Sequence, residues 1–179
     1  MIACLDVHYR DTSASACAAA VTFLGWTDAD VIDAKVVQVQ DVEPYEPGQF
    51  YRRELPCLLA VLQTLPPVDA VLIDGYVWLA DESRPGLGAH LHQALGGKIP
   101  VIGAAKTKFH GAGQACEVLR GESRRPLYVT AAGMEVNLAA EHVRSMHGVY
   151  RIPTLVAWVD QLCRRRLDAP GPQEPVRPS

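Results

Sequence analysis

The sequence predicts an α/β fold in which an antiparallel meander of three strands continues into parallel β-α-β units. Two observations support this prediction. Three apolar, strand-like segments follow one another at the start of the chain with short polar turns between them, which is typical of a meander. Beyond residue 50, helical periodicities alternate with short apolar strands, which is the rhythm of parallel β-α-β units.

The first half supplies the meander and one helix. We expect strands at residues 2–9, 15–25 and 31–39; the small apolar residues of the second strand suit a position pressed against helices. A helix is expected at 50–65, because leucines and valine recur there at helical spacing and two prolines follow it.

The second half supplies the parallel units and their covering helices. We expect strands at 70–74 and 100–105, an edge strand at 126–130, and helices at 87–95, 136–146 and 154–165. The last helix has an apolar face. A meander feeding into parallel units is the element order of the ribonuclease H-like fold.

Length and composition predict one domain. The 179 residues are 49% apolar and 21% charged, as in soluble globular proteins, and we assign residues 1–167 to a single domain. Residues 168–179 are rich in proline and polar side chains and are expected to be disordered. Without an apolar run of about 20 residues or a leader-like start, we expect a cytoplasmic monomer with no membrane contact.

Charge and cysteine usage exclude two further classes. The formal net charge of −3 argues against a polycationic nucleic-acid coat, although short basic runs such as Arg124-Arg125 could meet phosphates; alone, each run is equally an ordinary solvated face. The five cysteines lack C-x-x-C spacing and lie among apolar neighbours, which favours reduced core thiols over bridges or a zinc site.

Four carboxylates stand out. Asp6 and Asp74 lie in short apolar strands, Glu54 opens a helix, and Asp160 lies in the last helix. Carboxylates that converge from separate elements are the usual ligands of Mg²⁺ and Mn²⁺, which can support phosphodiester hydrolysis. Taken singly, each has a simpler interpretation: a strand-end cap, a helix-dipole acid, or a salt-bridge partner of Arg164.

Lys106 ends an apolar run and should emerge at the carboxyl edge of its strand, where α/β proteins gather ligands. A cation there could hold a phosphate. An ordinary surface lysine with its stem on apolar neighbours is the alternative.

Five motifs occur in a specific order over about residues 2–162, and this order resembles the endonuclease V family of nucleases that act on deaminated bases. The motifs are the strand with Asp6, Pro44-Tyr45-Glu46-Pro47-Gly48 with Arg53-Glu54 at its end, Asp74-Gly75, Ile102-Gly103-Ala104-Ala105-Lys106, and Arg151-Ile152-Pro153 followed by Asp160.

The resemblance implies a Mg²⁺-dependent endonuclease, with Mn²⁺ as an alternative, that cleaves 3′ to a deaminated base in nucleic-acid repair. Its partner would be DNA containing deoxyinosine, with single-stranded RNA containing inosine as a second candidate. The implied catalytic residues are Asp6, Glu54, Asp74, Lys106 and Asp160; the four acids are the implied metal ligands.

The resemblance also implies a way of inspecting the base. Tyr45, with Pro47, would act as a wedge that separates the strands once the damaged base leaves the stack. The flipped base would enter a pocket built largely from glycine-rich loops, where a missing Cβ lets a base approach the backbone. The implied pocket residues are Gly48, Phe50, Gly75, Gly103 and His90.

The chain departs from the family pattern after Asp74-Gly75. A second glycine and a His-Pro pair are missing, and Val77 stands where that glycine is expected, so that its side chain could narrow the pocket. Two alternatives therefore stay open. One is a protein that binds deaminated bases with weak or lost hydrolysis, and the other is a small-molecule α/β enzyme, which the net negative charge would suit.

Overall fold

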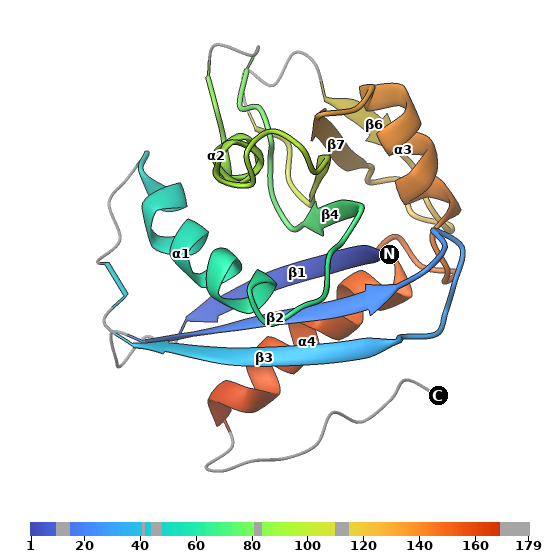
Figure 1. The fold of residues 1–179 in the computed structure, drawn as a ribbon. Helices are drawn as coiled ribbons and strands as arrows, with labels where there is room; N and C mark the ends of the chain where they lie inside the picture. Colours follow the sequence, from blue (N-terminus) through green and yellow to red (C-terminus); the bar gives the residue numbers. More distant parts are fainter. Residues whose placement is uncertain (10–14, 41, 44–47, 81–83, 110–114, 169–179) are drawn as a thin grey trace.

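The computed structural model describes residues 1–9, 15–40, 42–43, 48–80, 84–109 and 115–168 (Figure 1). Within these residues, one sheet of seven strands has the order β3-β2-β1-β4-β5-β7-β6 and is accompanied by four helices. The strands are β1 (Ile2–Tyr9), β2 (Ser15–Phe23), β3 (Asp33–Gln40), β4 (Ala70–Ile73), β5 (Val101–Ala105), β6 (Cys116–Val118) and β7 (Leu127–Ala132). The helices are α1 (Phe50–Leu62), α2 (Leu87–Ala94), α3 (Val136–Ser145) and α4 (Thr154–Asp168).

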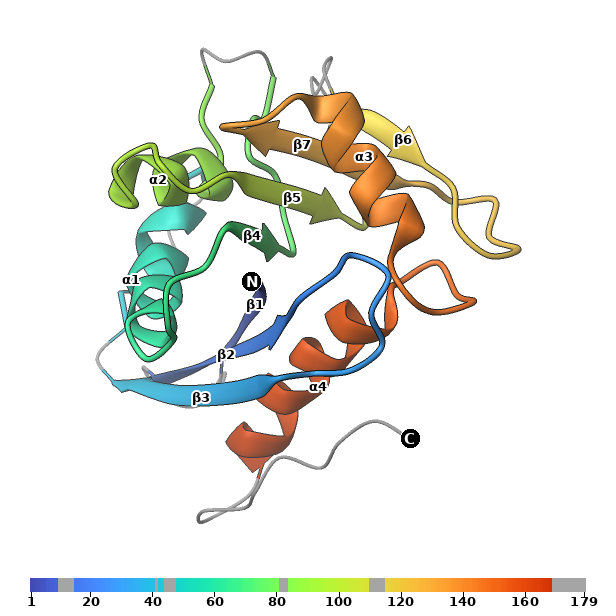
Figure 2. The same ribbon diagram turned by 45° about the vertical axis from the view of Figure 1, so that its right-hand side comes forward.

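The helices cover both faces of the sheet. Helices α1 and α2 lie on one face and α3 and α4 on the other (Figure 2). Strand β2 is buried on both sides, and its side chains alternate between two apolar clusters: Ala18 and Ala20 join the cluster under α1, and Ala19 the cluster under α4. Small side chains there let both helices approach the sheet closely.

The meander and the parallel unit are both confirmed. Strand β1 pairs antiparallel with β2, and β2 with β3, while β4 pairs parallel with β1 and β5 parallel with β4. The carboxyl ends of β1, β4 and β5 therefore meet at one edge of the sheet. This is the edge at which α/β folds collect functional side chains.

One strand assignment was wrong. Residues 126–130 were expected to form an edge strand, but β7 lies inside the sheet between β5 and β6. Strand β6, which the sequence analysis did not predict, forms the edge. At three residues it is too short to show a strand periodicity of its own, and its pairing with β7 is what defines it.

The turn between β2 and β3 is longer than expected. Strand β2 ends at Phe23 rather than at residue 25, and β3 begins at Asp33 rather than at residue 31. The Asp28 carboxylate accepts the Gly25 N–H at 2.7 Å, which closes a local turn and takes these residues out of the strand ladder.

The end of the chain is described as far as Asp168, where α4 ends. The tail predicted to be disordered otherwise lies outside the described residues. No helix among the described residues is long and apolar enough to cross a membrane. All five cysteines are free thiols, as predicted, and only Cys116 is not buried.

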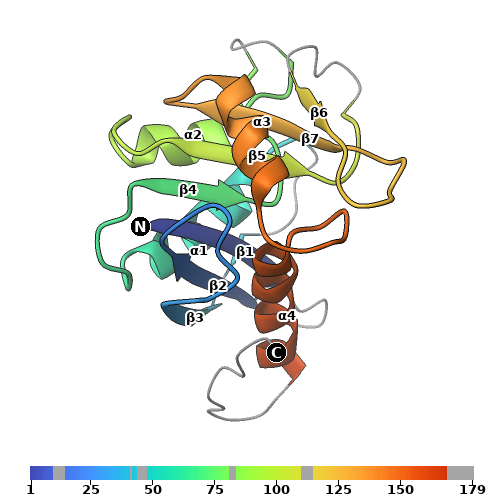
Figure 3. The ribbon, with the colours of Figure 1, turned by 90° about the vertical axis from the view of Figure 1, so that its right-hand side faces the viewer.

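A buried arginine organises the segment between α3 and α4. Arg120, which follows β6, is 6% exposed, and its guanidinium donates only to backbone carbonyls among the described residues. Burial lowers its pKa. The acceptors are the carbonyl oxygens of Arg144, Met146, Gly148, Tyr150 and Arg151. One side chain thus fixes the whole loop that leads into α4, which lies beside the β6-β7 hairpin (Figure 3).

We predict that Arg120→Met lowers the free energy of unfolding by about 2–4 kcal/mol, because buried carbonyls would lose their donors. Urea denaturation measures this change. Arg124→Met, a few residues away on an exposed side chain, is the matched control and should be nearly neutral. Equal effects of the two substitutions would contradict the anchoring role of Arg120.

Candidate active site

Three acidic side chains come together at the carboxyl edge of the parallel strands. Leu5 of β1 is in register with Ile73 of β4, so the residues that follow, Asp6 and Asp74, lie side by side. Glu54 reaches the same place from the first turns of α1 and is only 8% exposed. The structure therefore brings together three of the four predicted carboxylates from three separate elements.

Their pKa values show that these carboxylates interact. Burial and the charge of Asp74 raise the pKa of Asp6 to about 7, against the opposing hydrogen bond from the Val7 N–H. Burial and the charges of Asp6 and Asp74 raise the pKa of Glu54 to about 8. Concentrated negative charge in a partly dry site is the condition under which a cation binds strongly.

Lys106 supplies one cation to this site. It follows β5 directly, and its Nζ donates to the Asp74 carboxylate at 2.6 Å. Burial lowers the pKa of Lys106, but the hydrogen bond to Asp74 and the charges of Asp160 and Asp6 outweigh it, so the pKa is raised overall. The lysine is therefore charged at neutral pH and can attract an anion.

Asp160 satisfies both interpretations that the sequence left open. Its carboxylate accepts two hydrogen bonds from Arg164 at 3.0 and 3.1 Å, one helical turn away. Its charge also raises the pKa of Asp6 and of Lys106. Helix α4 is fixed against β1 here, since the Cys163 thiol donates to the Asp6 carbonyl at 3.2 Å.

The side chains as they stand do not form a ready-made metal cage. Within the described part of the chain, no three His, Cys, Asp or Glu side chains are grouped so that they could hold a metal ion. The assignment of the four acids as metal ligands stays a prediction. Their oxygen donors and mutual charge are of the kind that Mg²⁺ prefers.

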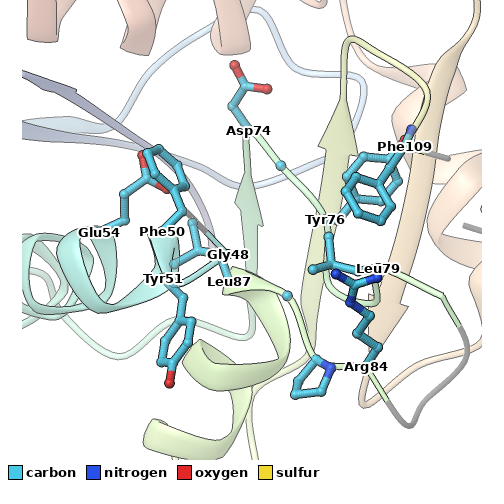
Figure 4. A pocket seen from close by; sticks show the side chains of 13 residues that line it. Gly48, Phe50, Tyr51, Glu54, Asp74, Tyr76, Leu79, Arg84, Leu87 and Phe109 are labelled. Atoms are coloured by element: carbon cyan, nitrogen blue, oxygen red, sulfur yellow. The ribbon is translucent and has the colours of Figure 1, made fainter. Parts of the chain in front are cut away.

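A cavity of about 420 Å³ opens beside these carboxylates (Figure 4). Both Glu54 and Asp74 lie in its wall, as do three of the predicted pocket residues, Gly48, Phe50 and Gly75. The other lining residues are Tyr51, Tyr76, Leu79, Arg84, Pro85, Gly86, Leu87 and Phe109. The cavity and the acidic cluster thus share a wall.

The two remaining predicted pocket residues lie behind the wall. His90 does not line the cavity; its ring stacks on that of Tyr51 with centroids 3.7 Å apart, and Tyr51 does line it. Gly103 sits beneath the loop after β4, where a Cβ would come within 2.5 Å of the Gly75 carbonyl oxygen. The predicted wedge residues Tyr45 and Pro47 lie outside the described residues.

Val77 does not narrow the cavity, contrary to the expectation from its position in the motif. Its side chain is fully buried and packs in the apolar core, close to the backbone of Gly88 in α2. A glycine at position 88 makes room for it, since a Cβ there would lie 2.6 Å from Val77 Cγ2.

Sequence analysis missed the aromatic side chains of the cavity. Phe50 and Tyr51 stand on the α1 side, and Tyr76 and Phe109 stand opposite, with the space between them (Figure 4). Tyr76 is fixed, because its hydroxyl donates to the Thr107 carbonyl at 2.9 Å and accepts the Phe109 N–H at 3.0 Å. The aromatic residue directly after Asp74-Gly75 was the one signal that could have indicated this wall.

Thr130 was also missed, although it positions the loop after β4. Its hydroxyl accepts the buried Val77 N–H at 2.8 Å, and the next residue of β7, Ala131, accepts the Trp78 indole N–H at 2.9 Å. Gly103 of β5, the strand partner of Thr130, allows the loop to approach this closely. The wall that carries Gly75 and Tyr76 is therefore held by β7.

A mixed sheet of this order, with acidic side chains clustered at the carboxyl ends of its parallel strands, defines a nuclease of the ribonuclease H-like class. The family model of Endonuclease V matches residues 1–150. The chain belongs to the endonuclease V family and is an endonuclease.

Similar proteins support this assignment. Endonuclease V of Streptomyces avermitilis is 35% identical over 91% of this chain and 79% of its own length, and that of Streptomyces coelicolor is 33% identical over 91% and 77%. The crystal structure of the Streptomyces avermitilis protein superposes with a TM-score of 0.74 at 32% identity, covering 93% of this chain and 81% of that one.

A more distant structure shares the fold. Ciona intestinalis Endonuclease V, crystallised with a 24mer DNA containing an inosine followed by a ribo-adenosine, has a TM-score of 0.80 at 19% identity. That similarity covers 93% of this chain and 85% of that one.

We predict that the hydroxyl of Thr130 controls the order of the loop after β4. Thr130→Val should lower the free energy of unfolding by about 1–3 kcal/mol and accelerate amide exchange of Val77, because the buried N–H loses its acceptor. Thr130→Ser keeps the hydroxyl and should retain most of the protection. Hydrogen exchange read residue by residue tests this, and unchanged Val77 exchange in the valine variant would contradict it.

The raised pKa of Glu54 predicts a pH-dependent stability of the metal-free protein. Its pKa rises from an ordinary value of 4.5 to about 8, so the folded state binds the extra proton and loses stability as pH rises between these values. Glu54→Gln should therefore stabilise the protein at pH 8.5 relative to wild type, and less so at pH 5.

Thermal unfolding in a chelator measures this difference. Glu117→Gln, on an exposed side chain of β6, is the control and should show no such pH dependence. A stability gain for Glu54→Gln that is the same at both pH values would disprove the raised pKa.

Proposed function

We propose that this endonuclease hydrolyses a phosphodiester 3′ to a deaminated base, that it requires Mg²⁺, and that deoxyinosine in DNA is its substrate, with inosine in RNA as a second candidate. One observation supports this most directly. The cavity shares Glu54 and Asp74 with the acidic cluster, so a base held in the cavity brings its own backbone to the carboxylates.

The cavity is suited to a base that has left its stack. Two aromatic walls can take the stacking lost from the duplex, and such replacement contacts must offset an unstacking cost of a few kcal/mol. Gly48 and Gly75, at φ of +81° and +142°, have no other atom within 4 Å of a Cβ position. A base edge can reach the backbone there, consistent with recognition through main-chain groups.

The inosine-containing DNA in the Ciona intestinalis complex supports this substrate class by similarity. At the two glycines and at Phe50, this chain keeps the pocket positions that the family pattern requires. The missing histidine of that pattern leaves the aromatic and backbone groups as the parts that select the base.

Asp6, Glu54 and Asp74, supported by Asp160, would hold Mg²⁺. When bound, the ion would stabilise the charge that builds on the phosphate and the leaving oxygen. Two features support the assignment: all four groups offer hard oxygen donors, and the pKa values of Asp6 and Glu54 are raised by the other acids, so a cation would relieve their repulsion. Carboxylates not engaged by the ion can orient the attacking water.

Lys106 would bind the scissile phosphate. Its Nζ lies at the edge where β4 and β5 end and already contacts Asp74, so a phosphate bound beside that carboxylate is within reach of the same charge. Its fixed positive charge stabilises the developing negative charge without a proton transfer.

Tyr45 and Pro47 would act as the strand-separating wedge. They precede Gly48 and Phe50, which already line the cavity, so an aromatic side chain presented from this turn would enter the duplex next to the extruded base.

The test uses an end-labelled oligonucleotide with one deoxyinosine and a matched oligonucleotide with deoxyadenosine in its place. With Mg²⁺, wild type should give one product, cut 3′ to the deoxyinosine, and EDTA should abolish it. Asp74→Ala should reduce the rate at least about a hundredfold and Lys106→Ala about ten- to a hundredfold, since each removes charge stabilisation of the transition state.

Lys98→Ala, remote from the cavity in sequence and exposed, is the control for loss of a lysine and should keep wild-type activity. No product above the Asp74→Ala background would refute the proposed hydrolysis. If the wild type bound the deoxyinosine strand tightly and did not cut it, a base-binding protein with lost hydrolysis would replace the proposal.

A further inference from the structure

The loop that leads into α4 presents two large apolar side chains to solvent. Val149 is 76% exposed and Tyr150 is 77% exposed, and Leu119, at the end of β6, is 58% exposed. A tyrosine this exposed buries little apolar area in the fold, so its presence needs another explanation.

This loop is held rigidly in spite of its exposure. Arg120 binds five of its backbone carbonyls, as described above. Gly121 packs against it so tightly that a Cβ would lie 2.2 Å from the Val149 carbonyl oxygen, and its φ is +57°. The exposed side chains therefore stand on an ordered backbone, and binding through them would lose little conformational entropy.

The loop is continuous with the active site. The Arg151 guanidinium donates to the Lys106 carbonyl oxygen and, at 2.8 Å, to that of Pro126. Residues 149–150 therefore directly adjoin the arginine that fixes the backbone of the proposed phosphate-binding lysine. The β6-β7 turn approaches the same edge of the sheet, because Tyr128 of β7 is in register with Ala105 of β5 (Figure 3).

The base cavity and this loop lie on opposite faces of the sheet. The cavity is lined from α1 and α2, whereas the loop joins α3 to α4 on the other face (Figure 2). Asp74 and Lys106 lie at the edge between them. A strand whose deaminated base enters the cavity must cross this edge at the scissile bond, and its 3′ continuation then reaches the loop.

The charge around the loop suits a nucleic-acid strand. Arg124 and Arg125, in the turn between β6 and β7, are exposed and have no carboxylate within ion-pair distance among the described residues. Glu122 is the one acid in that turn. Although the whole chain carries −3, this turn carries a net positive charge beside an exposed aromatic, a combination that binds single strands through phosphates and stacked bases.

We propose that Leu119, Arg124, Arg125, Val149 and Tyr150 form a 3′-strand platform, which binds the substrate strand on the 3′ side of the scissile bond. Tyr150 stacks against a base of that strand, and the two arginines contact its phosphates. This inference rests on the proposed cleavage 3′ to a deaminated base, and it adds a substrate-binding surface outside the cavity and the acidic cluster.

The test compares two single-stranded deoxyinosine oligonucleotides under the Mg²⁺ conditions above, one with two and one with ten nucleotides 3′ to the scissile bond. Wild type should have a lower KM for the long 3′ flank. Tyr150→Ala should raise that KM about fivefold or more, the lower range for loss of a base-stacking aromatic, and leave the KM for the short flank unchanged. Tyr150→Phe keeps the stacking face and should behave as wild type.

Arg124→Ala with Arg125→Ala should make the salt dependence of log KM for the long flank shallower by about 0.7 per lost phosphate contact. Leu24→Ala is the control, because Leu24 is 68% exposed in the turn after β2, away from this surface. Lengthening the 5′ flank instead should not change the effect of Tyr150→Ala.

The outcomes separate this inference from the proposed function. If wild type cleaves both oligonucleotides with equal KM, or if Tyr150→Ala impairs both equally, the 3′-strand platform is refuted while the proposed cleavage stands. The exposed apolar residues would then have to serve a protein partner. If wild type cleaves neither oligonucleotide, the proposed function is refuted and the platform with it.

Discussion

The parallel pairing of β1 with β4 is the constraint on which the rest of the structure depends. Because Leu5 and Ile73 are in register, Asp6 and Asp74 lie side by side in a partly buried place where like charges repel. Glu54 adds a third acid from α1. The apolar packing of the sheet offsets this repulsion, and Lys106 relieves part of it by pairing with Asp74. A site strained in this way attracts cations and anionic substrates bound through them.

The catalytic edge depends on strands that carry no catalytic residue. Strand β7 holds the loop after β4 through Thr130 and Ala131, and Gly103 of β5 lets that loop sit close enough. On the other face, Arg120 and Arg151 fix the loop before α4 against the end of β5. The cavity wall and the loop are thus both positioned by hydrogen bonds to backbone groups, which set geometry more narrowly than apolar contact does.

Departure from the family pattern has not damaged the pocket wall. Val77 replaces a glycine but turns into the core, where Gly88 makes room for it. Tyr76, between Gly75 and Val77, faces the cavity, and its hydroxyl is tied to the loop after β5. Alternation of side-chain direction along an extended segment explains why one substituted residue is hidden while its neighbour shapes the site.

The sequence by itself determined the elements and the acids, because periodicity, turn residues and the order of motifs are local properties that residues such as Asp6, Asp74 and Lys106 carry with them. Only the tertiary structure decided which side chains line the cavity, that His90 supports Tyr51 from behind, and that β6 covers β7 as the edge strand. These features arise from contacts between residues far apart in the chain, such as Val77 with Thr130. No local pattern encodes such a contact, since it exists only once the strands have been placed in their order in the sheet.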